Sequence, residues 1–129
     1  MTLYINTTKN NQAIVVIKNS NKQVVAKKLF TLYQQAEKLL PMIDKLLINN
    51  KIKLKDLKKI EVENKGGSFA SLRVGVTIAN SLGYVLGIPV IGLGGKTKII
   101  KNKNNREFSI VEPIYDSQPK ITVKKNIVD

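Results

Sequence analysis

One continuous segment, residues 64–92, constrains the fold of this chain more than any other. It reads NKGGSFASLRVGVTIANSLGYVLGIPVIG, so a glycine pair precedes a long apolar stretch and Gly-Ile-Pro follows it. The glycines favour a tight turn, and Ser68 is a suitable N-cap for a helix that runs to about Tyr84. The segment therefore predicts a strand that ends at Asn64, then a turn, a helix and a short buried strand over 89–93.

The turn itself allows two interpretations. Backbone N–H groups at a helix N-terminus attract phosphates and carboxylates, because the helix dipole favours negative charge there. Gly66, Gly67 and Ser68 are therefore a candidate anion or nucleotide contact. Their spacing lacks a full phosphate-binding fingerprint, which favours the simpler alternative of a tight turn.

The helix predicted over 68–84 has an unusually narrow polar side. At 100° per residue its polar groups form one stripe, and apolar residues occupy the rest of its circumference. Small residues at Gly75, Ala79 and Gly83 would let another backbone approach closely. We therefore expect a cover on two sides: the chain's own sheet, and either its own first helix or a helix of another subunit. The polar stripe consists of Arg73, Thr77, Asn80 and Tyr84.

The preceding residues predict three antiparallel strands and a first helix. The apolar positions between Leu32 and Leu47 repeat at the helical period, and Pro41 is expected to kink that helix near Glu37. Right-handed crossovers then give an α/β fold with a mixed five-stranded sheet in the order 3-2-1-4-5. This is the arrangement of ribonuclease H-like and actin-like ATPase-type lobes. The strands are predicted over 2–6, 12–18, 22–30, 59–63 and 89–93, the third of them near an edge.

After Gly94 the pattern predicts a C-terminal hairpin. Residues 96–101 and 106–111 can pair across a polar loop, and 120–129 are expected to form a loosely held tail. A chain of 129 residues is expected to form one compact unit. We divide it into a lobe over 1–94 and a hairpin and tail over 95–129.

Composition limits the chemistry. The chain has no cysteine and no histidine, so it has no thiolate or imidazole for catalysis or metal binding. Its net charge of +13 favours acidic partners such as RNA, but only Arg73 and Arg106 are arginines. A dedicated nucleic-acid surface and a solvated lysine coat both remain open. The sequence shows neither a signal peptide nor a long apolar run, so we expect a cytoplasmic protein without a membrane contact.

Several linked segments resemble the TsaB family, formerly YeaZ. TsaB is the partner subunit of TsaD, the enzyme that helps place threonylcarbamoyl groups on an adenosine beside the tRNA anticodon. The resemblance covers roughly the first 93 residues, the N-terminal lobe of that family, and the last residues look like the family's closing ones. The matching segments are INTT, AEKLLPMIDKLL, GGSFASLRVGVTIANSLGYVLGIPVIGL and IVEPIYDSQPKITVKK.

The chain departs from the family pattern in three places. The second lobe is largely missing, and only a hairpin-length stretch stands there. Asn6-Thr7 replaces the usual Asp-Thr, and Gly66-Gly67 replaces the usual Pro-Gly. Asparagine cannot supply the negative charge that organises a metal ion in nucleotide-binding relatives. We therefore expect no metal or cofactor of its own, with ATP or ADP only at the interface with TsaD.

The resemblance implies a non-catalytic scaffold or activator subunit. In the family, two helices of the first lobe pack on the equivalent helices of TsaD, or of a second copy when the protein is alone. A TsaD-like protein is therefore the expected partner, a homodimer of the chain alone stays open as the alternative, and any contact with tRNA is expected only within the complex. By position, the interface would use Leu39, Leu40, Ile43, Leu47, Leu72, Gly75, Val76 and Ala79.

Two other functions remain as alternatives. A lysine-rich tRNA-binding module would lose affinity steeply with salt. A minimal metal-dependent nuclease or phosphotransferase would need two or three clustered carboxylates. The first strand offers Asn6 instead, and only Glu61 and Glu63 mark the fourth.

Overall fold

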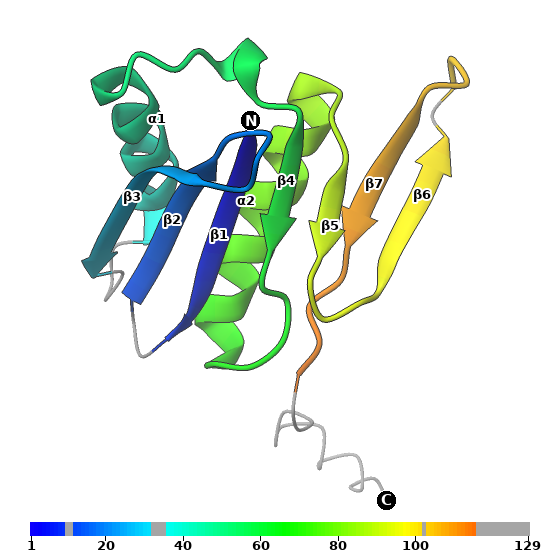
Figure 1. Ribbon diagram of the computed structural model, residues 1–129. Helices are drawn as coiled ribbons and strands as arrows, with labels where there is room; N and C mark the ends of the chain where they lie inside the picture. The colour runs from blue at the N-terminus through cyan, green and yellow to red at the C-terminus, as the bar shows by residue number, and fades with distance from the viewer. Residues whose placement is uncertain (10–11, 32–35, 102, 116–129) are drawn as a thin grey trace, which may run out of the picture.

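The computed structural model describes residues 1–9, 12–31, 36–101 and 103–115 (Figure 1). Within these ranges the chain forms seven strands, two α-helices and two short 3-10 helices. In chain order they are β1 (Thr2–Lys9), β2 (Gln12–Lys18), β3 (Val24–Thr31), η1 (Ala36–Lys38), α1 (Leu39–Asn49), η2 (Leu54–Asp56), β4 (Lys59–Val62), α2 (Phe69–Leu86), β5 (Val90–Gly92), β6 (Thr97–Lys101) and β7 (Glu107–Val111).

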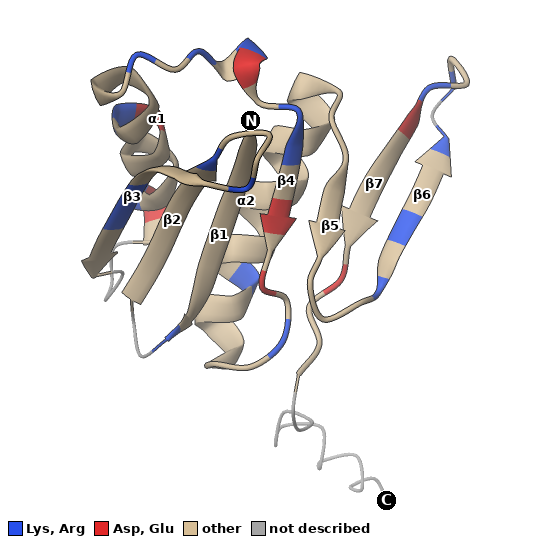
Figure 2. Ribbon diagram, viewed as in Figure 1, with Lys and Arg blue, Asp and Glu red and all other residues tan. Residues whose placement is uncertain are grey.

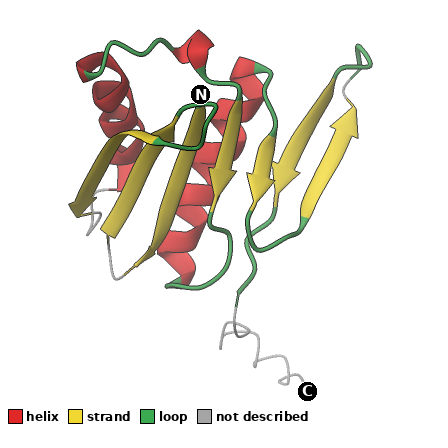
Figure 3. Cartoon of the chain, in the orientation of Figure 1, coloured by secondary structure: helices red, strands yellow, loops and turns green. Residues whose placement is uncertain are grey.

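The main sheet has five strands in the order β3-β2-β1-β4-β5, which confirms the predicted α/β fold. β1 pairs antiparallel with β2 and parallel with β4, and β4 pairs parallel with β5. Both α-helices cover the same face of this sheet (Figure 3). Alternate residues of β1 supply that face, because Leu3 and Ile5 are completely buried against the helices.

The first helix differs from its prediction. α1 begins at Leu39, after η1, and the expected start at Leu32 lies outside the described residues. Pro41 is the third residue of α1. The first four backbone N–H groups of a helix have no partner within the helix, so a proline there removes no hydrogen bond. The expected kink near Glu37 is therefore wrong: Pro41 belongs to the first turn.

The second helix begins at the predicted cap and ends at Leu86, just beyond the predicted end near Tyr84. The Ser68 hydroxyl accepts a hydrogen bond from the Ser71 N–H at 3.1 Å and caps its N-terminus. Gly87, in the left-handed region with φ of +69°, ends it. The helix crosses β1 closely at Gly75, where an added Cβ would lie 2.5 Å from the Thr7 hydroxyl oxygen. This close approach explains why a helix interior contains glycine here.

The predicted C-terminal hairpin is present as β6 and β7, which pair antiparallel in a sheet of their own. β7 lies beside β5 and α2 (Figure 1). Val111 of β7 is 1 % exposed and belongs to the main core. The hairpin therefore covers one side of α2. The sequence had predicted covers from the sheet and from another helix, but not from the hairpin.

The sequence interpretation found no membrane-length apolar run, but α2 is long and apolar enough to be one. Its 18 residues have a mean hydropathy of 1.2, and 33 % of them are buried. A helix packed across a sheet in a protein core also meets this criterion. The other residues of α2 are half-buried or exposed, and the exposed ones include both apolar and polar side chains.

Candidate functional site

A groove runs between α2 and η1 and has a volume of about 420 Å³. Its lining is mostly apolar, with a charged residue from each side. Val74 and Ile78 are half-buried on its floor, and Ala70 is exposed at one end. The lining residues are Ala36, Glu37, Ala70, Arg73, Val74, Thr77 and Ile78.

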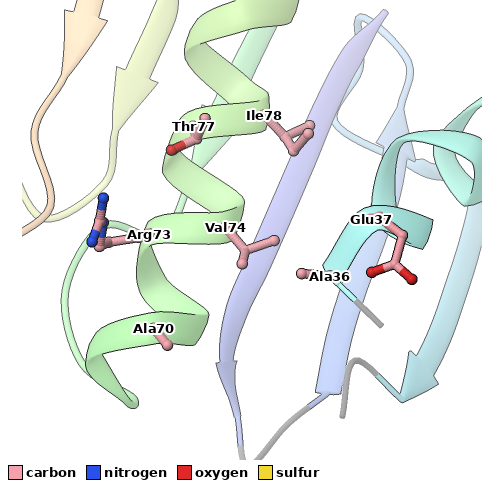
Figure 4. A pocket seen from close by; sticks show the side chains of 7 residues that line it. All are labelled: Ala36, Glu37, Ala70, Arg73, Val74, Thr77 and Ile78. Carbon is pink, nitrogen blue, oxygen red and sulfur yellow. The ribbon is translucent and has the colours of Figure 1, made fainter. Parts of the chain in front are cut away.

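The apolar side chains of the groove come from one stripe of α2. Ala70, Val74 and Ile78 recur every fourth residue, so they lie on the same side of the helix. Figure 4 shows Val74 and Ile78 pointing from α2 towards Ala36 of η1, while Arg73 points to the other side of the helix. The groove therefore presents an apolar floor that a helix of another molecule could cover.

The opposite side of α2 is closed by β7. The Asn80 side-chain amide donates to the Val111 carbonyl at 2.9 Å, and its oxygen accepts from the Val111 N–H at 2.8 Å. The Tyr84 and Phe108 rings meet edge to face, with centroids 5.0 Å apart. Asn80 and Tyr84 of the predicted polar stripe thus contact the chain's own hairpin, although Tyr84 remains 58 % exposed.

Most of the predicted partner-interface residues lie in the chain's own core. Leu39, Ile43 and Leu47 of α1 are at most 1 % exposed, so they face the sheet. Only Leu40, at 44 % exposed, is accessible to another molecule. The assignment of the buried residues to a partner contact needs correction, because side chains already packed inside the chain have no surface left to offer. The buried ones on α2 are Leu72, Gly75, Val76 and Ala79.

The sequence reasoning missed the groove stripe, although the sequence holds a signal for it. It selected the most apolar face of each helix, which is the face that packs on the sheet. The stripe of Ala70, Val74 and Ile78 is a second apolar face beside the buried one. A helix with two apolar stripes and only one sheet to cover indicates a second contact surface.

The glycine junction before α2 is a tight turn against β1. Gly66 and Gly67 have φ of +93° and +79°, a region that favours glycine. A Cβ on Gly67 would lie 2.6 Å from the Thr8 Cα, so only glycine fits there. The Thr7 hydroxyl also donates to the Ser71 carbonyl at 2.7 Å and fixes the helix start to β1. These contacts account for the sequence of the turn, and the anion contact at Gly66, Gly67 and Ser68 stays a prediction.

The end of β1 contains a closed polar network around Asn6. Its side-chain oxygen accepts from the N–H and the hydroxyl of Thr8, at 2.8 Å and 2.6 Å. Its amide donates to the Tyr4 hydroxyl at 3.2 Å, and that hydroxyl donates to Glu63 at 2.8 Å. Burial, followed by the hydrogen bond to Glu63, raises the pKa of Tyr4 to about 12. The Asn6 side chain thus forms hydrogen bonds within the chain, and these bonds stabilise the end of β1.

The acidic residues of β4 also have partners within the chain. Glu61 lies 3.3 Å from the Lys18 ammonium and 3.5 Å from that of Lys59. Glu63 accepts the hydrogen bond from Tyr4. In the described ranges, no three residues of the types His, Cys, Asp and Glu lie close enough together to hold a metal ion. The two glutamates named for the nuclease alternative are thus engaged in structural contacts.

Sequence comparison finds one matching family model and two similar curated proteins. The family model described as "TsaD: tRNA N6-adenosine threonylcarbamoyltransferase" matches residues 31–108, which is more than half of the chain. The tRNA threonylcarbamoyladenosine biosynthesis protein TsaB of Buchnera aphidicola subsp. Schizaphis graminum is 45 % identical over 56 residues. TsaB of Bacillus subtilis is 31 % identical over 80 residues.

These alignments cover only part of this chain and only part of each relative. They cover 43 % and 61 % of this chain, and 27 % and 34 % of the Buchnera and Bacillus proteins. The chain thus spans about a quarter to a third of the length of the curated relatives it matches. Most of the length of these two relatives is not aligned with this chain.

Solved structures show the same fold at low sequence identity. YeaZ from Pseudomonas aeruginosa matches with a TM-score of 0.62 at 18 % identity, over 76 % of this chain and 51 % of that one. A second protein, described by its similarity to YeaZ, matches over the same shares with a TM-score of 0.63. The chain therefore belongs to the family of the TsaD model and, within it, to the TsaB (YeaZ) group.

Proposed function

We propose that this chain is a non-catalytic subunit in the biosynthesis of threonylcarbamoyladenosine in tRNA. The proposal is supported by family membership and by the names of the two TsaB relatives. In this role the chain binds a TsaD-like protein and holds it in an active arrangement. The chemistry belongs to the partner, and any ATP or ADP lies at the interface with it.

The observation that carries this proposal is the apolar groove on the open side of α2. A TsaD-like partner inserts a helix there, with its own apolar side chains against Val74 and Ile78. The small side chain of Ala70 lets the partner helix approach the α2 backbone at one end. Glu37 on η1, and Arg73 on the far side of α2, can pair with charges on a partner that lies across the helix and set its orientation.

Calorimetric titration of the chain with the TsaD-like protein of the same organism tests this assignment. Ala70→Trp places a large side chain in the groove and is expected to weaken binding at least tenfold, which corresponds to about 1.4 kcal/mol. Ile99→Trp is the matched control, because Ile99 is 64 % exposed on β6, away from α2. Unchanged affinity for Ala70→Trp together with weaker binding for Ile99→Trp would move the contact to the hairpin.

A second measurement tests the non-catalytic role. Threonylcarbamoyl transfer to tRNA is measured with the TsaD-like protein and the remaining components of the reaction, with and without this chain. The chain alone is expected to give no transfer and to raise the rate when added. Transfer by the chain alone would contradict the proposal.

Light scattering of the chain alone addresses self-association. The same groove would be buried in a homodimer, so Ala70→Trp is expected to shift a dimer to monomers. A monomer at all concentrations would leave the TsaD-like protein as the proposed occupant of the groove.

A further inference from the structure

The segment between α1 and β4 is rich in lysine. Residues 51–59 read KIKLKDLKK, so five of nine residues are lysine, compared with 22 basic residues in 129 for the whole chain. Figure 2 shows basic residues along this segment, at the end of the sheet where β4 begins. A uniform lysine coat would not concentrate charge in this way.

The chain holds the backbone of this segment in place. Ile52 and Leu57 are 7 % and 1 % exposed and belong to the main core. The Asp56 carboxylate accepts from the Lys53 N–H at 2.9 Å, and the Lys58 N–H donates to the Met1 carbonyl at 2.8 Å. The apolar anchors turn the intervening lysines outward. Exposed lysines stand at Lys51, Lys53, Lys55 and Lys58.

A second basic element lies next to this segment. The N-terminal ammonium group of Met1 donates to the Asp56 carbonyl at 2.9 Å, so it is also at this end of the sheet. Thr2 pairs with Lys18 on one side and Lys59 on the other. The turn that follows Lys18 adds the exposed Lys22. We call residues 51–59 together with Lys18 and Lys22 the basic end.

Few negative charges compensate the basic end. Glu61 lies between Lys18 and Lys59 and offsets part of their charge. The Asp56 carboxylate is used on the backbone of Lys53. Within the described residues, no carboxylate lies within 4.0 Å of the other ammonium groups of the basic end. These unpaired lysines are Lys22, Lys51, Lys53, Lys55 and Lys58.

We propose that the basic end binds the phosphate backbone of tRNA. Lysine offers a point charge on a flexible stem, which suits phosphate contacts and not bidentate base recognition. The surface therefore positions RNA without reading its sequence. The choice of RNA over an acidic protein rests on the proposed function in tRNA modification. The basic end is separate from the groove, so a TsaD-like protein and tRNA can bind this chain together.

The test measures binding of the full chain to an unmodified tRNA transcript by fluorescence anisotropy over a range of salt concentrations. The triple variant Lys53→Gln, Lys55→Gln, Lys58→Gln removes three charges from the basic end. Each lost phosphate contact lowers the slope of log affinity against log salt by about 0.7–0.9, so the slope is expected to fall by about 2. Affinity at low salt is expected to drop at least about tenfold.

The matched control removes the same charge elsewhere. Lys9→Gln, Lys27→Gln, Lys28→Gln changes three exposed lysines on β1 and the edge strand β3. This control is expected to keep most of the affinity and slope. Equal losses in both triple variants would overturn the proposal in favour of a uniform lysine coat. Equal affinity of the chain for poly-glutamate would overturn the choice of RNA.

The two proposals can fail separately. Ala70→Trp in the groove is expected to bind tRNA like the unmodified chain while losing the TsaD-like protein. The basic-end variant is expected to show the reverse. Loss of tRNA binding in Ala70→Trp, with circular dichroism showing an intact fold, would contradict a separate RNA surface.

Discussion

The two sides of α2 differ in what covers them. On one side, Asn80 bonds both backbone groups of Val111, and Tyr84 meets Phe108. On the other side, Val74 and Ile78 form the floor of an open groove. Both sides belong to one helix with a nearly continuous apolar circumference. Among the described residues, the hairpin covers the side of α2 that carries Asn80 and Tyr84, and the side that carries Val74 and Ile78 lines an open groove.

On the covered side of α2, hydrogen bonds determine how β7 packs on the helix. An amide that pairs with a backbone N–H and carbonyl fixes the register of β7 along α2, which apolar contacts alone would not do. On the open side, the floor of the groove is apolar, and the polar residues Glu37, Arg73 and Thr77 stand around it. A partner that covers this side would therefore need polar groups of its own opposite Glu37 and Arg73.

The largest expected effect is at Asn80. Asn80→Ala leaves the Val111 N–H and carbonyl without their partner and is expected to lower the free energy of unfolding by about 2–4 kcal/mol. Urea denaturation followed by circular dichroism measures it. A change below about 0.5 kcal/mol, the usual range of surface substitutions, would mean that the hairpin does not cover this flank.

A second expected effect lies between the hairpin and β5. The Ser109 hydroxyl accepts from the buried Val90 N–H at 2.7 Å. Ser109→Ala leaves that N–H unsatisfied, at an expected cost of about 1–3 kcal/mol. The same denaturation measurement applies, and Ser81→Ala on the exposed surface of α2 is the control. Equal stability of the two variants would show that β7 is held to β5 by apolar contacts alone.

The ring contact should give a smaller coupling. A double-mutant cycle of Tyr84→Ala and Phe108→Ala is expected to show a coupling of about 0.5–1.5 kcal/mol, as measured for other edge-to-face pairs. Additive effects of the two substitutions would place the rings apart in solution.

The smallest effect is expected on the open side. Thr77 is exposed at the groove, so Thr77→Ala is expected to change the stability of the chain alone by less than about 0.5 kcal/mol. A loss comparable with that of Asn80→Ala would show that the groove is already covered in the free chain, and the contrast between the two sides would disappear.

Much of the fold could be predicted because its signals are local. The alternation in β1, the cap at Ser68 and the exit at Gly87 each act over a few residues, and right-handed crossovers then order the strands. Pro41 was misread because its effect depends on where the helix starts. The predicted start came from the helical repeat of apolar residues. That repeat begins before the first residue of α1, so it does not mark where the helix starts.

The candidate site was harder to predict because it depends on contacts distant in sequence. The interface prediction selected Leu72 and Val76, the most apolar positions, and these are the ones that the sheet buries. Asn80 looked like a solvent-facing residue until β7 was placed beside it. Asn64 was likewise taken only as the end of a strand. Its side chain instead bonds the Gly95 and Glu112 carbonyls at 2.7 Å and 2.8 Å.

Amide hydrogen exchange of the chain, alone and with the TsaD-like protein, tests the central claim most directly. The claim is that a partner covers the open side of α2. The partner is expected to slow exchange in residues 36–38 and 70–78 and to leave residues 107–111 unchanged. Slower exchange confined to 97–111, with 70–78 unchanged, would contradict it.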